Sequence, residues 1–211
     1  MQTVSLMKGR KEEQLNKRSK GKRYDFSVVA FAFFLISFLG WAYETLLMLV
    51  WHGKFYDRGF LFLPFCPIYG FPVCALYLLI GTPTEGRFSS FIERRLMSWK
   101  KVPKALLRDS LYYLLSGGFA TLVELIVGLI LERAGLCLWT YCSQPFNFRG
   151  HICLQVSLLW GLMLTVFMRF AMPFLLKLVQ KIPRRARIAL CVLFSVCLLV
   201  DFSYQVFQRL A

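Results

Sequence analysis

Residues 26–51 have the sequence FSVVAFAFFLISFLGWAYETLLMLVW, and this stretch decides the fold class. It carries a single charged side chain, that of Glu44. A helix that crosses the hydrocarbon core of a bilayer needs about 20 mostly apolar residues at a rise of about 1.5 Å each. The stretch is therefore long enough to span a membrane with some tilt, and we interpret the chain as an integral membrane protein.

Four more apolar stretches follow, so the predicted fold is an all-α integral membrane bundle of about five transmembrane helices. The predicted spans are Phe26–Trp51, Phe60–Ile80, Leu111–Leu131, Ile152–Phe170 (continuing toward Leu178) and Ile188–Phe207. The second span contains Pro64, Pro67 and Pro72, which predicts that its first half is kinked or non-helical. Such backbone is tolerated at membrane depth only where protein buries it or where it lines water.

Every second connecting segment holds most of the positive charge of the chain. Residues 1–25, 82–108 and 169–187 hold 8, 7 and 6 of the 26 Lys and Arg. Because basic segments beside spanning helices resist translocation, these three segments are expected in the cytoplasm. We therefore predict a multi-pass protein of the cell membrane with a cytoplasmic N-terminus. Residues 1–25 would be a disordered basic tail, and residues 26–208 a polytopic transmembrane domain.

The net charge of +15 does not indicate a nucleic-acid partner. No groove-reading motif accompanies the charge, and basic segments beside membrane spans normally face anionic lipid. The expected partner is thus the lipid bilayer. No cofactor is expected, and no metal either. His52 and His151 lie near the outer ends of two spans, and even with Cys153 or Asp57 they are more typical of polar residues at a membrane interface.

One segment between the second and third spans is amphipathic. Its apolar side chains share one helical face, while its charged side chains lie elsewhere: Phe88, Phe91, Ile92, Leu96 and Trp99 against Glu93, Arg94, Arg95 and Lys100. Two interpretations remain open. The segment is either a helix lying in the inner membrane interface or a docking helix for a cytoplasmic partner.

Three acidic residues fall well inside predicted spans: Glu44, Glu124 and Asp201. Each lies roughly 10–12 Å below the outer end of its helix, at about 1.5 Å per residue. Arg58 and Arg149 lie at the same mouth, and their long side chains can reach down to pair with a carboxylate. These five residues are the candidate site. They either bind a polar substrate or couple protons, or they form a structural ion-pair network; no catalytic residue is assigned.

An internal repeat is visible at the two outer junctions. Arg58-Gly59 opens the second span and Arg149-Gly150 opens the fourth. Eleven residues after each of these glycines comes another glycine, preceded by an aromatic residue, and the span before each junction carries one acid: Tyr69, Gly70 and Glu44 in one copy, Trp160, Gly161 and Glu124 in the other. The chain is thus interpreted as two helical hairpins in parallel orientation plus a fifth helix, with a site expected between the repeats.

Several strings resemble one known family. They are Gly40-Trp41 with Glu44, then Asp57–Leu61 and Pro64–Phe71, and later Leu138–Tyr141, Pro145–Asn147, Gly150, Ile152–Leu154, Ser157-Leu158 and Trp160-Gly161. They resemble the bacterial "putative ABC-transporter permease" family of type IV (the CmpB-like family) over residues 30–205. The chain departs from the family pattern at Asp57, Leu63 and Thr140, where the family has Asn, Gly and Asp.

The resemblance implies a permease subunit rather than an enzyme. The chain has no Gly-rich phosphate-binding loop followed by Lys and Ser or Thr, so ATP hydrolysis would need a separate subunit. That subunit would dock on the cytoplasmic side near residues 88–101, and five spans suit a homo- or hetero-oligomer. The expected function is transport of a polar substrate. The alternatives are a structural or regulatory membrane subunit, or an enzyme acting on lipid-linked substrates.

Overall fold

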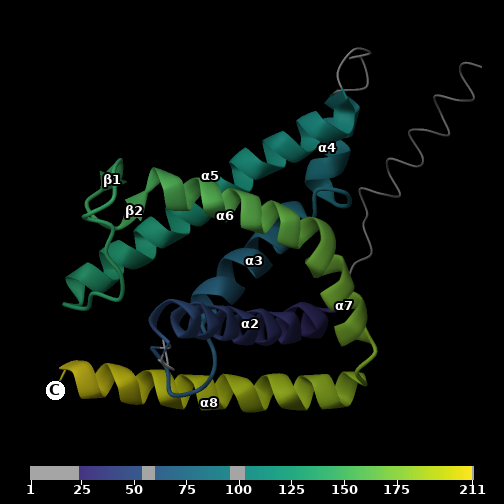
Figure 1. The fold of residues 1–211 in the computed structure, drawn as a ribbon. Coiled ribbons are helices and arrows are strands. Elements are labelled where there is room, and N and C mark those ends of the chain that lie inside the picture. Colours follow the sequence, from purple (N-terminus) through teal and green to yellow (C-terminus); the bar gives the residue numbers. More distant parts are fainter. Residues whose placement is uncertain (1–23, 54–59, 96–102, 211) are drawn as a thin grey trace, which may run out of the picture. The chain divides into compact units, whose positions relative to one another are not determined.

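The computed structural model describes residues 24–53, 60–95 and 103–210, and it is helical as predicted. Two short strands, β1 (Asn147–Phe148) and β2 (Ile152–Cys153), pair antiparallel between α5 and α6. The helices, labelled in Figure 1 where there is room, are α2 (Phe26–His52), α3 (Pro67–Ile80), α4 (Arg87–Arg95), α5 (Lys104–Arg133), α6 (Leu154–Val166), the π-helical segment η2 (Phe167–Ala171), α7 (Met172–Gln180) and α8 (Arg184–Leu210). The predicted tail lies almost wholly outside the described residues.

Four of these helical stretches are long and apolar enough to cross a membrane, and the protein is therefore a multi-pass membrane protein. They are Phe26–Trp51, Ala105–Arg133, Leu154–Gln180 and Arg184–Gln208. In each span, other parts of the protein bury at most 44% of the residues in its most apolar stretch. The remaining residues are available for contact with lipid. The remaining predicted span, the second one (Phe60–Ile80), contains a shorter apolar helix, α3.

The break predicted at the start of the second span is confirmed, because residues 60–66 are not helical. Each backbone N–H group from Phe62 to Cys66 has a partner. Asp201 accepts from the first two, Leu63 O accepts from Phe65 N, and Ser37 O accepts from Cys66 N; Pro64 has no N–H to satisfy. Protein groups thus pair the non-helical backbone, which is the condition under which a membrane tolerates it.

The chain divides into two compact units, which we describe separately. One consists of the described residues of Tyr24–Ala75 and Phe174–Ala211. In it α2 runs beside α8, and Phe34, Phe65 and Phe194 pack ring against ring. At the start of both helices, Asp25 pairs with Arg184 and Arg187, while the buried Arg187 also donates to Ser27 and to the Val179 and Ile182 carbonyls.

The other unit consists of the described residues of Leu76–Pro173, and its core is the α5–α6 pair, which runs side by side in Figure 1. Glycines let the two backbones approach: a methyl group at Gly117 would lie 3.2 Å from the Cα of Gly161. Polar side chains close the other end of α5. Asp109 pairs with Arg169 of η2, and Arg108 pairs with Glu93 of α4.

The amphipathic segment predicted near residues 88–101 is helical over Arg87–Arg95, where it forms α4; residues 96–102 lie outside the described part. The Phe88 ring packs edge-on against Tyr112 of α5, which fixes the helix, and Ser89 and Ser90 are buried. Phe91 and Arg95 are exposed. The helix therefore offers a mixed apolar and basic surface, and the choice between interface helix and docking helix stays a prediction.

Candidate functional site at the end of helix α5

One face of α5 carries two carboxylates with a glycine between them. Glu124, Gly128 and Glu132 follow at intervals of four residues, so that they lie above one another on the same side of the helix. We call these three residues the α5 stripe. Glu132 lies at the last turn of the helix and is half exposed, whereas Glu124 is only 8% exposed. The stripe thus leads from the helix end into the membrane-spanning part.

A loop folds back over this stripe because of a tight turn between the two short strands. Arg149 and Gly150 adopt left-handed backbone angles, with φ of 53° and 72°, and the turn is closed by a hydrogen bond from His151 N to Phe148 O of 3.1 Å. Tyr141 N donates to Gly150 O at 2.8 Å, and the Trp139 indole donates to His151 O at 3.0 Å. The returning loop is thereby fixed to the start of α6.

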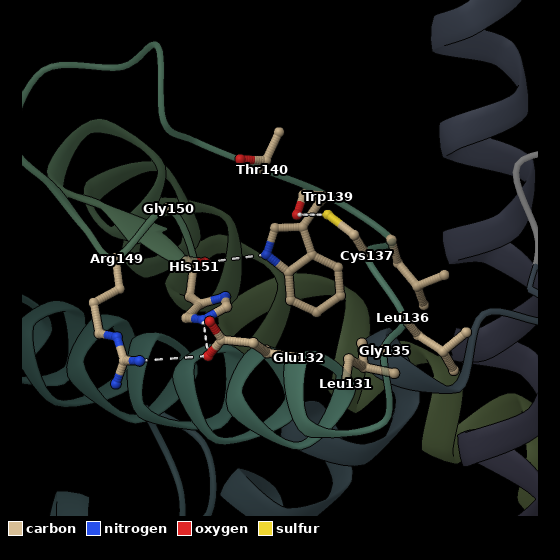
Figure 2. A pocket seen from close by; sticks show the side chains of 12 residues that line it. Leu131, Glu132, Gly135, Leu136, Cys137, Trp139, Thr140, Arg149, Gly150 and His151 are labelled. Atoms are coloured by element: carbon tan, nitrogen blue, oxygen red, sulfur yellow. Dashed lines mark hydrogen bonds and ion pairs between the residues drawn. The ribbon is translucent and has the colours of Figure 1, made fainter.

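Three charged or titratable side chains gather at the Glu132 end of the stripe, as Figure 2 shows. Nε2 of His151 lies 3.1 Å from Oε2 of Glu132, and a guanidinium nitrogen of Arg149 lies 3.6 Å from the same oxygen. The His151 ring also lies against the helix: a methyl group added at Gly128 would be 3.0 Å from its Cγ and Nδ1. Glycine at position 128 is therefore what allows the ring to rest on the stripe.

A cavity of about 250 Å³ opens beside these groups. Its wall combines charged groups with apolar ones: Glu132, Arg149 and His151 on one side, Leu131, Leu136 and Trp139 on the other. Its size is close to the lower limit of pockets that hold small ligands, which is about 300 Å³. It can take a small polar molecule with an apolar part.

Glu124 lies one helical turn below Gly128 and is held by aromatic groups. The Tyr141 hydroxyl donates to Oε1 of Glu124 at 2.8 Å, and the Trp160 indole of α6 also interacts with the carboxyl group. Oε2 is buried with no hydrogen-bond partner within 3.5 Å among the described residues. A carboxyl oxygen in that position costs free energy unless a proton or another ligand compensates it.

The five predicted site residues do not all have the partners expected of them. Arg149 pairs with Glu132, which is nearer, and not with a carboxylate deeper in the membrane. Oδ1 and Oδ2 of Asp201 accept from Phe62 N at 3.2 Å and Leu63 N at 2.8 Å, and Oε1 of Glu44 accepts from the Tyr69 hydroxyl at 2.6 Å. Arg58 lies outside the described residues.

The predicted repeat has a structural counterpart in the contacts of the two hairpins. In the first, α2 with residues 60–75, a methyl group at Gly70 would lie 2.7 Å from the Phe33 ring, and Tyr69 bonds Glu44. In the second, α5 with α6, a methyl group at Gly161 would lie 3.0 Å from the Tyr113 ring, and Trp160 interacts with Glu124. The corresponding positions of the first helices lie 80 residues apart in the sequence: Phe33 and Tyr113, Ser37 and Gly117, Glu44 and Glu124. Those of the second helices lie 91 residues apart: Tyr69 and Trp160, Gly70 and Gly161.

The two separations differ by eleven residues, so the loop of the second hairpin is longer by that number. The longer loop supplies Trp139 and Tyr141, which cover the stripe. Sequence reasoning missed Tyr141, Glu132 and the role of His151 in the site. The spacing of Glu124, Gly128 and Glu132 was a readable signal, whereas nothing in the loop sequence indicates that Tyr141 returns to Glu124.

No group of three or more His, Cys, Asp or Glu side chains is placed to hold a metal ion in the described ranges. Of the residues considered for a metal, Asp57 and the side chain of His52 lie outside those ranges, and His151 is engaged with Glu132. The described part of the stripe does hold one carboxylate–imidazole pair, Glu132 with His151.

Comparison with known proteins gives one match. The family model described as "Putative ABC-transporter type IV" matches residues 31–206, which is most of the chain and includes both hairpins. No curated protein and no solved structure matches the chain significantly.

Proposed function

The chain belongs to the family described as putative ABC transporters of type IV, and from that premise we propose that it is a permease subunit that moves a small polar substrate. The observation that carries the proposal is the cavity at the end of α5, where charged and apolar groups meet above a buried carboxylate. A pocket with apolar walls and a few convergent charged groups is typical of small-ligand sites.

The proposal includes an orientation. The three basic segments are proposed to face the cytoplasm, which would place the end of α5 and its cavity on the outer side. Substrate would then reach the cavity from outside. In this arrangement α4 lies on the cytoplasmic side, with Phe91 and Arg95 exposed for a partner.

Energy would come from a separate ATPase subunit that docks near residues 88–101, since the chain lacks a phosphate-binding loop of its own. Five spans are few for a transport pathway, so the permease would act as a homo- or hetero-oligomer. The chain itself is not proposed to be an enzyme.

The test is purification of the tagged chain in mild detergent, followed by ATP hydrolysis and transport assays in vesicles loaded with isotope-labelled cell extract. We expect an ATPase in the complex and ATP-dependent movement of at least one small solute. Arg95→Glu on α4 should reduce co-purification of the ATPase, whereas the matched control Arg185→Glu, an exposed arginine on α8, should not. A chain that carries no ATPase and moves no solute would refute the proposal.

A second function, a structural or regulatory membrane subunit, is favoured by one specific observation. Asp201 accepts from two consecutive backbone amides, and Glu44 and Glu124 each accept from a tyrosine hydroxyl, so all three intramembrane acids have protein hydrogen-bond partners. If this were the whole function, Glu124→Gln and Arg149→Gln would change activity only as far as they change stability. The permease proposal instead expects folded, stable variants at these positions that no longer transport.

A further inference from the structure

We propose that Glu124 is a proton-binding site and that Glu132 and His151 form the route by which protons reach it from the end of α5. The inference goes beyond substrate transport, because it needs no ATPase and no substrate. It depends on the α5 stripe and on the ring that covers it.

Burial is the first observation. Glu124 is only 8% exposed, its Oε1 accepts from Tyr141, and its Oε2 has no hydrogen-bond partner among the described residues. A buried carboxyl group in a membrane helix needs a partner charge, water or a proton. Both Tyr141 and Trp160 are hydrogen-bond donors and neither is a cation, so a proton is the ligand that the site can take without rearrangement.

The second observation is a connection from this carboxyl group to the helix end. Glu132 is half exposed and lies two turns above Glu124 on the same face. His151 lies between them, with Nε2 at 3.1 Å from Glu132 and Nδ1 over Gly128, one turn from Glu124. Histidine is the side chain best suited to accept a proton on one ring nitrogen and release one from the other near neutral pH.

The transfer balances at each step. A proton from water binds the Glu132 carboxylate and then passes to Nε2 of His151, which leaves Glu132 ionised and the imidazole with two N–H groups. The proton on Nδ1 is then released to a water molecule over Gly128, which carries it one turn along α5 to the Glu124 carboxylate. That carboxyl group becomes neutral, and the imidazole is neutral again as the other tautomer. Reversal of these steps returns the proton to the helix end.

The other groups facing the stripe are few. Arg149 pairs with Glu132, and Tyr141 reaches Glu124 from the loop. The Cys142 sulfur lies beside Gly150. Helix α6, which packs against α5, has no charged residue, so it adds no competing charge.

The first hairpin provides a matched internal control. Glu44 is the counterpart of Glu124 in the repeat and likewise accepts a hydrogen bond from a tyrosine, Tyr69, but it is less buried. Among the described residues, Glu124 has a buried carboxyl oxygen without a hydrogen-bond partner, and Glu44 does not. The connecting loop of its hairpin is shorter by eleven residues in the sequence. A proton site is therefore inferred for one acid of the pair and not for the other.

The test labels the full-length protein in lipid nanodiscs with a membrane-permeant carbodiimide, which reacts with protonated carboxyl groups, and maps the adducts by mass spectrometry. The pH is varied across the range in which histidine titrates, about 5 to 8. We expect an adduct at Glu124 that decreases as pH rises. After a rapid drop in pH, His151→Gln and Glu132→Gln should label Glu124 several-fold more slowly than the wild type, with the same final extent.

The wild type alone tests the site, so the inference does not depend on a variant that folds. It is overturned if Glu124 is unlabelled, if its labelling does not vary with pH, or if Glu44 shows the same dependence. It is also overturned if both variants match the wild-type rate. A positive result would stand even where no ATPase and no transport is found, so the two proposals fail separately.

Discussion

Replacing Asp201 tests most directly how the broken second span is held. Its two carboxylate oxygens accept hydrogen bonds of 3.2 Å and 2.8 Å from the amides of Phe62 and Leu63, and the residue is only 9% exposed. Asp201→Ala leaves both amides without a partner. Each unpaired buried N–H costs about 1–3 kcal/mol, so the expected loss of unfolding free energy is about 2–6 kcal/mol.

The conservative replacement separates the contribution of each bond. Asp201→Asn keeps one side-chain oxygen and turns the other into an NH₂ donor, so one of the two amides loses its acceptor. Its expected loss is about 1–3 kcal/mol, roughly half that of Asp201→Ala. Ser203→Ala, at an exposed position on the same helix, is the control and should stay within about 0.5 kcal/mol of the wild type.

The assay is equilibrium unfolding of the purified protein in mixed micelles with increasing SDS, monitored by circular dichroism. The expected order of stability is wild type and Ser203→Ala, then Asp201→Asn, then Asp201→Ala. An Asp201→Ala variant as stable as the Ser203→Ala control would refute the reasoning, since two unpaired amides at that depth should not be free of cost.

Three further predictions concern other contacts. Gly161→Ala should destabilise the α5–α6 pair by about 1–3 kcal/mol, because the new methyl group would lie 3.0 Å from the Tyr113 carbonyl oxygen. Gly118→Ala, inside α5 with nothing within 4 Å, should instead stabilise by about 0.5–1 kcal/mol in the same unfolding assay. Tyr69→Phe should cost about 1–2 kcal/mol through the lost bond to Glu44, and a double-mutant cycle with Glu44→Gln should show that the two changes are not additive. Slight burial raises the pKa of Asp25, but hydrogen bonds from Ser27 and the charges of Arg184 and Arg187 outweigh it, so the pKa lies below the ordinary value. The ionised Asp25 therefore stabilises the fold above its unfolded-state pKa, and this stabilisation is lost as pH falls through the lower folded-state pKa. In thermal unfolding measured across that acidic range, the melting temperature of Asp25→Asn should fall less with decreasing pH than that of the wild type.

The helices could be predicted because each depends on local composition. The predicted span at residues 26–51 agrees with the bounds of α2, Phe26–His52, to within one residue. The prolines of the second span indicate the break before α3. A proline removes an N–H and clashes with the preceding turn whatever surrounds it, so this prediction needs no tertiary information.

The site was only partly predictable, because it depends on how a loop returns to its helix. Depth along each span correctly singled out Glu124 as a buried acid. Its partner Tyr141 is 17 residues away, and the path between them includes Phe146 and Arg149, two non-glycine residues with left-handed backbone angles that no local signal indicates. Arg149 was expected to reach a deeper carboxylate, but Glu132 at the helix end is closer and more accessible.

The short length of α3 has a consequence for how the second span crosses the membrane. Its 14 residues cover only about 21 Å at 1.5 Å per residue, against a hydrocarbon thickness of about 30 Å. The non-helical residues 60–66 therefore have to supply the rest of the crossing, and an extended chain covers about 3.3 Å per residue. Asp201, which pairs two of their amides, thus helps to determine how far this span reaches across the bilayer.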